Sequence, residues 1–139
     1  MIVGLGIDLV ELSRIRHSLE RFGDQFLHRL LHSSELADLP PPSAALKEDK
    51  PASSRLISFT AARFAAKEAG AKALGTGFSG GIGLHDIRIH SLPSGQPTIS
   101  FHGQARIVAD SLGARNAHLS LSHAKETAGA VVILETEAR

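Results

Sequence analysis

The sequence has no cysteine, no tryptophan and no tyrosine, and it carries almost no net charge. Without cysteine the chain can form no disulfide, no zinc ribbon and no thiol nucleophile, a composition that accords with a reducing compartment. The formal net charge of +1, from 15 basic and 14 acidic residues, gives no bulk attraction to nucleic acid or to a membrane. The longest wholly apolar run, from Ala130 to Leu134, is far too short to cross a bilayer. We therefore expect a soluble protein of the cytoplasm.

What the sequence does contain is an ordinary globular composition, with 139 residues of which 42% are hydrophobic, so we expect a single domain spanning residues 1–139. Hydrophobic periodicity predicts strands at 1–12, 86–91, 97–101, 118–123 and 128–135, and helices at 13–22, 24–31, 58–74 and 104–112. Neighbouring strands that read as hairpins predict an α+β fold with a largely antiparallel sheet. Residues 40–54, rich in proline, serine and charge, predict a mobile surface linker.

The central helix, ended by Gly75, places a carboxylate and an ammonium on a stripe that should face the core. At a period of 3.6, Glu68 and Lys72 share this stripe with Ala61, Phe64, Ala65 and Ala71. One interpretation is an ordinary ion pair between Glu68 and Lys72, worth a few tenths of a kcal/mol. The other is a carboxylate that binds a metal, beside a lysine that binds a phosphate. The spacing alone favours the first.

The first strand ends in an aspartate on an otherwise empty face. Val3, Leu5, Ile7 and Leu9 fall on one face, while Gly4, Gly6 and Asp8 fall on the other. Glycines at these positions allow a neighbouring backbone or a ligand to approach closely. Asp8 is therefore either available for chemistry or part of a local turn.

The helix that follows has a basic outer face, with Arg14, His17 and Arg21 at i, i+3 and i+7. Such a face is either simply solvated, which is the commoner case, or a docking surface for an acidic partner. The glycine-rich stretch 75–83 after the central helix also has two interpretations. Its exposed backbone N–H groups can bind an anion, or the stretch is only a flexible turn, as many such loops are.

Three motifs together resemble one family. They are Gly4–Glu11 at the N-terminus, Arg63–Ala69 with Lys72–Gly75 in the central helix, and Ser120–His123 near the C-terminus. In this order they resemble the holo-[acyl-carrier-protein] synthases, the small type of 4′-phosphopantetheinyl transferase. The resemblance covers nearly the whole chain, from residue 1 to about residue 135.

Membership would imply the activity, fold and partners. The expected reaction transfers the 4′-phosphopantetheine arm of coenzyme A to a serine of apo-acyl carrier protein, releases adenosine 3′,5′-bisphosphate, requires Mg²⁺ and serves fatty acid biosynthesis. The family is typically a homotrimer with active sites between adjacent chains. The basic residues of its first helix meet an acidic helix of the carrier protein, which here points to Arg14 and Arg21.

The resemblance also implies roles for individual residues. Asp8 and Glu68 occupy the positions of the metal ligands, and Mg²⁺ commonly takes one or two carboxylates together with waters and phosphate oxygens. Lys72, one turn beyond Glu68, is expected to reach the pyrophosphate and to take part in catalysis with Glu68. Further phosphate or nucleotide contacts are expected from four other residues, Arg63, Lys67, Gly75 and His123. The general base stays open between a water on the metal and a carboxylate such as Glu68.

Two departures from the family pattern stand out. Gly70 occupies a position that is usually aromatic, which removes packing and costs about 1 kcal/mol of helix propensity relative to alanine. The linker at 40–54 is also longer than expected, and it could alter how the carrier protein or coenzyme A enters. Two alternatives to the transferase follow: a non-catalytic module that binds carrier protein, and a hydrolase that cleaves coenzyme A without a protein acceptor.

Overall fold

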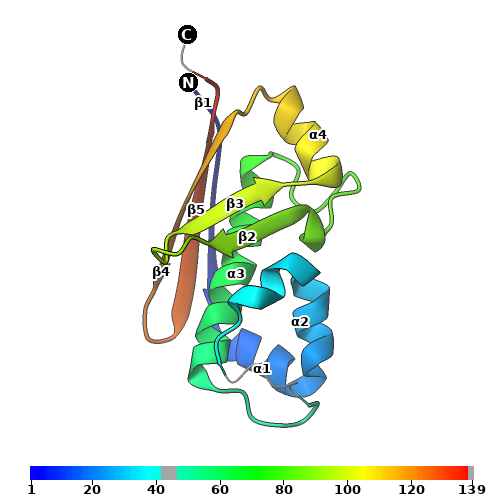
Figure 1. Cartoon of the computed structure of the whole chain (residues 1–139), viewed down its shortest axis with the longest axis vertical. Coiled ribbons are helices and arrows are strands. Elements are labelled where there is room, and N and C mark those ends of the chain that lie inside the picture. Colours follow the sequence, from blue (N-terminus) through cyan, green and yellow to red (C-terminus); the bar gives the residue numbers. More distant parts are fainter. Residues whose placement is uncertain (42–46, 138–139) are drawn as a thin grey trace.

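The computed structural model describes residues 1–41 and 47–137, and it contains two antiparallel sheets and a set of helices (Figure 1). In chain order the elements are β1 (Ile2–Glu11), α1 (Leu12–Phe22), α2 (Asp24–Leu30), the 3₁₀ helix η1 (Ser33–Asp38), α3 (Ser54–Ala73), the 3₁₀ turn η2 (Leu84–Asp86), β2 (Ile87–Ser91), β3 (Pro97–Phe101), α4 (Gly103–Ser111), β4 (Asn116–His123) and β5 (Thr127–Glu135). None of the described helices combines the length and hydropathy needed to span a membrane.

The larger sheet has the strand order β1-β5-β4, and every pairing in it is antiparallel. The almost continuously apolar β5 lies in the centre, as its sequence predicts. Strands β2 and β3 form a separate two-stranded antiparallel sheet, which is the hairpin expected at 86–101. The predicted α+β class is confirmed.

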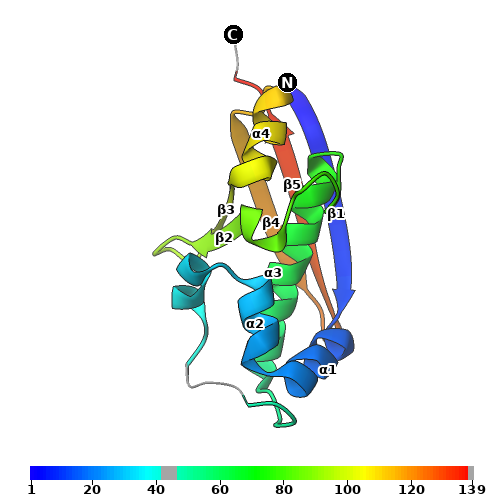
Figure 2. The same cartoon turned by 90° about the vertical axis from the view of Figure 1, so that its right-hand side faces the viewer.

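Helix α3 packs against the glycine face of β1 (Figure 2). A Cβ atom added to Gly6 would overlap the carbonyl oxygen of Ala69, and one added to Gly4 would overlap that of Ala73. The close approach that these glycines allow is therefore used by the backbone of α3. As a consequence, the apolar face of β1 points outward, and Leu5, Ile7 and Leu9 are 64%, 63% and 71% exposed.

The core-facing stripe predicted for α3 is only partly correct. Ala61, Ala65 and Ala71 are buried, but Phe64 and Glu68 are half-buried and Lys72 is exposed. Helix α3 contacts β1 and β5 on one side and β2 on another, so it buries residues around most of its circumference. Amphipathic periodicity is a weak guide for a helix that is enclosed in this way.

The predicted linker at 40–54 is described only in part, and residues 42–46 lie outside the described residues. The part that follows them, from Lys47, runs beside α1 before α3 begins at Ser54 (bottom of Figures 1 and 2). Ser53 caps α3 by accepting a hydrogen bond from the backbone N–H of Leu56 at 3.1 Å.

Candidate functional site

The candidate site lies where β1 runs alongside α3. Lys72 on α3 donates from Nζ to Asp8 Oδ1 on β1 at 3.0 Å, and to the carbonyl oxygen of Ile7 at 3.0 Å. The Lys72 side chain is 51% exposed and that of Asp8 is 15% exposed. The close packing of α3 on Gly4 and Gly6 brings these side chains, 64 residues apart in sequence, into contact. The structure therefore pairs Lys72 with Asp8, whereas the spacing alone favours a pair with Glu68.

Glu68 belongs to the same cluster electrostatically. Partial burial raises the pKa of Glu68 above its ordinary value, and the negative charge of Asp8 raises this pKa further. Lys72 and Arg14 oppose the shift, because a nearby positive charge favours the ionised carboxyl group. Arg14 also lies over the ring of Phe64, with 5.7 Å between Cζ and the ring centroid. The start of α1 thus reaches the edge of the cluster, a placement that the basic pattern of α1 does not reveal.

The two carboxylates suit a divalent cation that shares its ligands with a substrate. The two carboxylates repel each other, and this repulsion contributes to the raised pKa of Glu68. A bound cation relieves such repulsion. Within residues 1–41 and 47–137, no group of three or more His, Asp or Glu residues could hold a metal ion by itself. A closed, all-protein site is therefore not formed there. Mg²⁺ commonly uses one or two carboxylates and completes its octahedron with waters and phosphate oxygens, so Asp8 and Glu68 fit it.

Lys67, the residue before Glu68, points to a different part of the molecule. Its Nζ is fully buried and donates to Glu35 Oε1 at 2.8 Å, to the carbonyl oxygen of Leu84 at 2.8 Å and to that of Ile87 at 2.6 Å. Burial lowers the pKa of Lys67, and the pairing with Glu35 only partly offsets this. All three N–H donors of the ammonium are engaged within one chain, which gives Lys67 a structural role there. The phosphate contact expected of Lys67 remains a prediction.

Glu35 is the residue of this network that the sequence pattern does not reveal. It lies in the short helix η1 and is 1% exposed. A single carboxylate within a polar stretch gives no periodic signal. The only available clue is that a lysine on an enclosed helix needs a buried partner.

Arg63 lies one turn before Lys67 and is also buried, with 5% exposure. Its Nη2 donates to Ser91 Oγ at 2.8 Å, and its Cζ lies 4.5 Å from the centroid of the Phe59 ring. Its Nε is buried without a hydrogen-bond partner, the single such side-chain atom among the described residues. The phosphate contact expected of Arg63 remains a prediction, and within one chain the residue lies on the β2 side of α3.

The other predicted residues are spread over the surface. Gly75 follows the C-cap of α3 with a φ of 82°, which confirms it as the residue that ends the helix. His123 is exposed at the end of β4, and β5 separates it from β1. Arg21 is exposed near the end of α1. Only Asp8, Glu68, Lys72 and Arg14 therefore come together within one chain.

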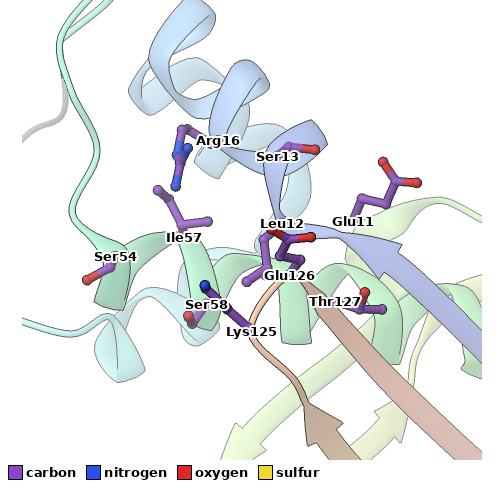
Figure 3. A pocket seen from close by; sticks show the side chains of 10 residues that line it. All are labelled: Glu11, Leu12, Ser13, Arg16, Ser54, Ile57, Ser58, Lys125, Glu126 and Thr127. Atoms are coloured by element: carbon purple, nitrogen blue, oxygen red, sulfur yellow. The ribbon is translucent and has the colours of Figure 1, made fainter.

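A cleft of about 580 Å³ lies at the end of β1, where α1, the first turns of α3 and the turn between β4 and β5 meet (Figure 3). In Figure 3, Arg16 and Lys125 extend toward the space between these elements, whereas Glu11 and Ser13 point away from it. The lining includes two basic residues, Arg16 and Lys125, and two acidic ones, Glu11 and Glu126. None of the predicted site residues lines it. The balanced charge gives no reason to assign the cleft an anionic ligand.

Comparison with known proteins bears directly on this site. The sequence pattern of the 4′-phosphopantetheinyl transferase superfamily matches residues 4–128. The holo-[acyl-carrier-protein] synthase of Nitratidesulfovibrio vulgaris is 46% identical over 136 residues, which cover 98% of this chain and 100% of that relative. The chain belongs to the 4′-phosphopantetheinyl transferase superfamily. The resemblance inferred from the three sequence motifs is confirmed.

Solved structures of superfamily members share the fold. The holo-[acyl-carrier-protein] synthase of Neisseria meningitidis aligns with a TM-score of 0.81 at 32% identity, covering 98% of this chain and 100% of that one. The holo-[acyl-carrier-protein] synthase of Helicobacter pylori, solved in complex with coenzyme A, aligns with a TM-score of 0.74 at 30% identity, covering 94% and 99%. One of these superfamily members was solved with coenzyme A, and this is the chemical context in which we consider the cluster of Asp8, Glu68 and Lys72.

Proposed function

We propose that this protein transfers the 4′-phosphopantetheine arm of coenzyme A to a serine of apo-acyl carrier protein, in the service of fatty acid biosynthesis in the cytoplasm. The observation that carries the proposal is the cluster of Asp8, Lys72 and Glu68 beside β1, in a chain that is 46% identical to a holo-[acyl-carrier-protein] synthase. Two carboxylates beside a half-exposed lysine suit the handling of a pyrophosphate.

The reaction requires one bond to form and one to break. The serine oxygen of the acceptor attacks the phosphorus that carries the pantetheine arm, and the bond from that phosphorus to the bridging oxygen breaks. Adenosine 3′,5′-bisphosphate leaves with the bridging oxygen, and the serine proton passes to a base. Lys72 uses two of its N–H donors on Asp8 and Ile7, so the third is available to a pyrophosphate oxygen. Its positive charge stabilises the charge that develops on the departing bisphosphate.

Asp8 and Glu68 would hold the Mg²⁺ that the family requires, and the bound ion would offset negative charge on the pyrophosphate and the leaving group. The contribution of the protein is to hold both carboxylates in place. Asp8 is fixed by Lys72 and by its position on β1, and Glu68 by the packing of α3 on that strand. Phosphate contacts by Arg63, Gly75 and His123 belong to this proposal, and the contact expected of Lys67 stays a prediction.

We further propose that the protein works as a homotrimer with active sites between chains. The exposed apolar face of β1, formed by Leu5, Ile7 and Leu9, supports this, because soluble proteins seldom leave such contiguous faces uncovered. A neighbouring chain could also bring His123 close to a cluster from which its own chain separates it. Ile7→Glu should convert the trimer to monomers in sedimentation analysis and reduce transfer. A monomeric wild type would contradict the proposal.

The function is tested by incubating the protein with apo-acyl carrier protein, coenzyme A and Mg²⁺ and measuring the intact mass of the acceptor. The wild type should add one phosphopantetheine arm to each acceptor. Asp8→Asn and Glu68→Gln should each abolish the mass gain while leaving the circular dichroism spectrum unchanged. Asp110→Asn, which neutralises an exposed carboxylate on α4, is the matched control and should retain activity.

Each alternative has its own outcome in this assay. Release of bisphosphate from coenzyme A without acceptor would indicate a hydrolase. Carrier binding without a mass gain would indicate a non-catalytic binding module. Full activity of Glu68→Gln would show that the metal-ligand assignment is wrong.

A further inference from the structure

The N-terminus of the short helix η1 is capped by a histidine. The backbone N–H of Ser34 donates to Nδ1 of His32 at 3.1 Å, and the backbone N–H of His32 donates to Glu35 Oε1 at 2.8 Å. The two hydrogen bonds are reciprocal, as in a capping box, where Ser, Thr, Asp or Asn more commonly supplies the side-chain acceptor. Histidine differs from these residues because its acceptor nitrogen takes up a proton close to neutral pH.

The hydrogen bonds of His32 determine which of its ring nitrogens carries the proton. A backbone N–H only donates, so Nδ1 of His32 is unprotonated and the proton of the neutral ring lies on Nε2. The Ser34 hydroxyl lies 2.9 Å from the same Nδ1 and 3.2 Å from Nε2 of His90, so it links the two rings. A protonated imidazole donates at both nitrogens and accepts at neither. The cap therefore requires the neutral form of His32.

The surroundings of His32 favour this neutral form. Partial removal from water lowers the pKa of His32, and the positive charge of Arg88 on β2 lowers it further. His85 on η2, whose ring centroid lies 5.9 Å from that of His32, lowers the pKa in the same way. Glu35 opposes the shift, and Lys67 adds a smaller lowering. The proton is therefore disfavoured by the same groups that pack around the cap.

Four further titratable groups lie on or near η1 and the strand β2 that packs against it, namely Asp38, Asp86, His90 and His102. Asp38 and Asp86 each accept a hydrogen bond from a backbone N–H, at 3.1 and 2.9 Å, and these bonds do not involve a histidine ring. Burial lowers the pKa of His102, and Arg88 and His32 lower it further. The charges that act on His32 are therefore mostly positive.

The cap acts on the buried network around Lys67. Glu35, which closes the capping box, accepts from Lys67 Nζ at 2.8 Å with Oε1 and from the backbone N–H of Ile89 at 3.0 Å with Oε2. Lys67 precedes Glu68 on α3, and Glu68 is the proposed metal ligand. Helix η1 thus connects the protonation of His32 with the part of α3 beside the catalytic cluster.

We propose that His32 is a proton-sensitive positioning residue. While His32 is neutral, η1 is capped and Glu35 holds Lys67 and Ile89 in place. A proton from the solvent on Nδ1 breaks the hydrogen bond from Ser34, loosens η1 and weakens the pairing of Glu35 with Lys67. The switch is inferred from the structure alone, and only its effect on transfer rests on the proposed function.

The protonation of His32 is measured in long-range proton–nitrogen NMR spectra of the full chain with labelled histidines. The signal is assigned by its loss in His32→Asn. At about pH 8, His32 should show the tautomer with its proton on Nε2, and it should titrate at a lower pH than a histidine in an unstructured peptide. A proton on Nδ1 at that pH, or titration at or above the pH of the peptide, would overturn the proposal.

The consequence for the network is measured by hydrogen exchange of the Ile89 amide. Between about pH 8 and about pH 5 its protection factor should fall about two- to thirtyfold in the wild type, which is the size of a typical N-cap contribution. His32→Asn and His32→Ser supply acceptors that do not titrate in this range, so both should keep the protection. His17→Asn, at an exposed histidine on α1, is the matched control and should behave like the wild type. Equal losses in the wild type and in His32→Asn would refute the switch.

Stability gives an independent measurement with a defined sign. The unfolded chain binds a proton at His32 at a higher pH than the folded chain does, because folding lowers this pKa. Stability is therefore lost as the pH falls from the unfolded pKa toward the folded one. The urea midpoint should fall less on acidification in His32→Asn than in the wild type and in His17→Asn. Parallel falls in all three proteins would contradict the proposal.

Transfer of the phosphopantetheine arm is the final measurement. As the pH falls below about 6, kcat should decline more steeply in the wild type than in His32→Asn. If the wild type transfers the arm but both proteins decline equally, His32 does not position the catalytic cluster. If the wild type transfers nothing at any pH, the proposed function fails, and the NMR and exchange measurements still decide whether His32 acts as a switch.

Discussion

The buried pair between Lys67 and Glu35 makes the sharpest prediction about stability. The two side chains are 0% exposed, and the ammonium has three hydrogen bonds. Glu35 accepts further bonds from the backbone N–H of His32 at 2.8 Å and of Ile89 at 3.0 Å. The network joins η1, α3 and β2, three elements that are distant in sequence. We therefore consider the substitution Glu35→Gln.

Replacing the carboxylate by an amide leaves the Lys67 ammonium buried without a counter-charge. The amide also presents an N–H₂ group where Glu35 accepts hydrogen bonds at both oxygens. Removing one partner of a buried ion pair typically costs about 3–5 kcal/mol. Since a domain of this kind is stable by about 5–15 kcal/mol, the loss is a large fraction of the total.

The assay is equilibrium unfolding in urea, followed by far-ultraviolet circular dichroism at one fixed protein concentration. Glu35→Gln and Lys67→Met should each lower the free energy of unfolding by about 3–5 kcal/mol. The double variant should lose much less than the sum of the two single losses, because neither charge is then left unpaired. Arg106→Gln, which removes an exposed pair with Asp110, is the control and should cost less than about 1 kcal/mol.

Two results would refute this reasoning. If Glu35→Gln lay within about 1 kcal/mol of the wild type, the ammonium would not depend on its buried counter-charge. If the double variant lost the full sum, the two residues would act independently rather than as a pair.

Three further predictions concern the contact between α3 and its neighbours. Folding raises the pKa of Glu68 above 4.5, so ionised Glu68 costs stability above that pH; in EDTA, Glu68→Gln should raise the urea midpoint at about pH 8 and hardly change it at about pH 4. Gly6→Ala should destabilise the protein by about 2 kcal/mol or more in urea, because the new Cβ overlaps the carbonyl oxygen of Ala69; unchanged stability would contradict the close packing. Gly70→Ala should change thermal stability little, because the gain of about 1 kcal/mol in helix propensity is offset by close contacts of the new Cβ with Ile99 Cδ1 at 3.0 Å and Ile87 Cγ2 at 3.2 Å; a loss above about 2 kcal/mol would mean that these side chains cannot move.

Local sequence pattern was sufficient for much of the fold. Period-2 alternation placed β1, β4 and the hairpin of β2 and β3, and the continuous apolar run of β5 predicted a central strand. The three motifs identified the family and selected Asp8, Glu68 and Lys72, which the structure brings to one place.

Other features depended on tertiary contacts. Alternation determines which residues of β1 share a face, but it cannot determine which face is buried. Here the glycine face packs on α3 because only glycine lets the helix backbone approach so closely, and the apolar face points outward. The same limit applies to Lys67 and Lys72, which are both lysines of one helix.

Lys67 and Lys72 lie five residues apart on α3, so their side chains face different neighbours. Lys67 pairs with Glu35 in the interior, while Lys72 pairs with Asp8 at the surface. Sequence alone determined which chemical groups the chain carries, namely the two carboxylates and several basic residues. It also determined the order of the helices and strands. The tertiary structure decided which of these charges are available to a ligand, because burial and pairing depend on residues that are distant along the chain.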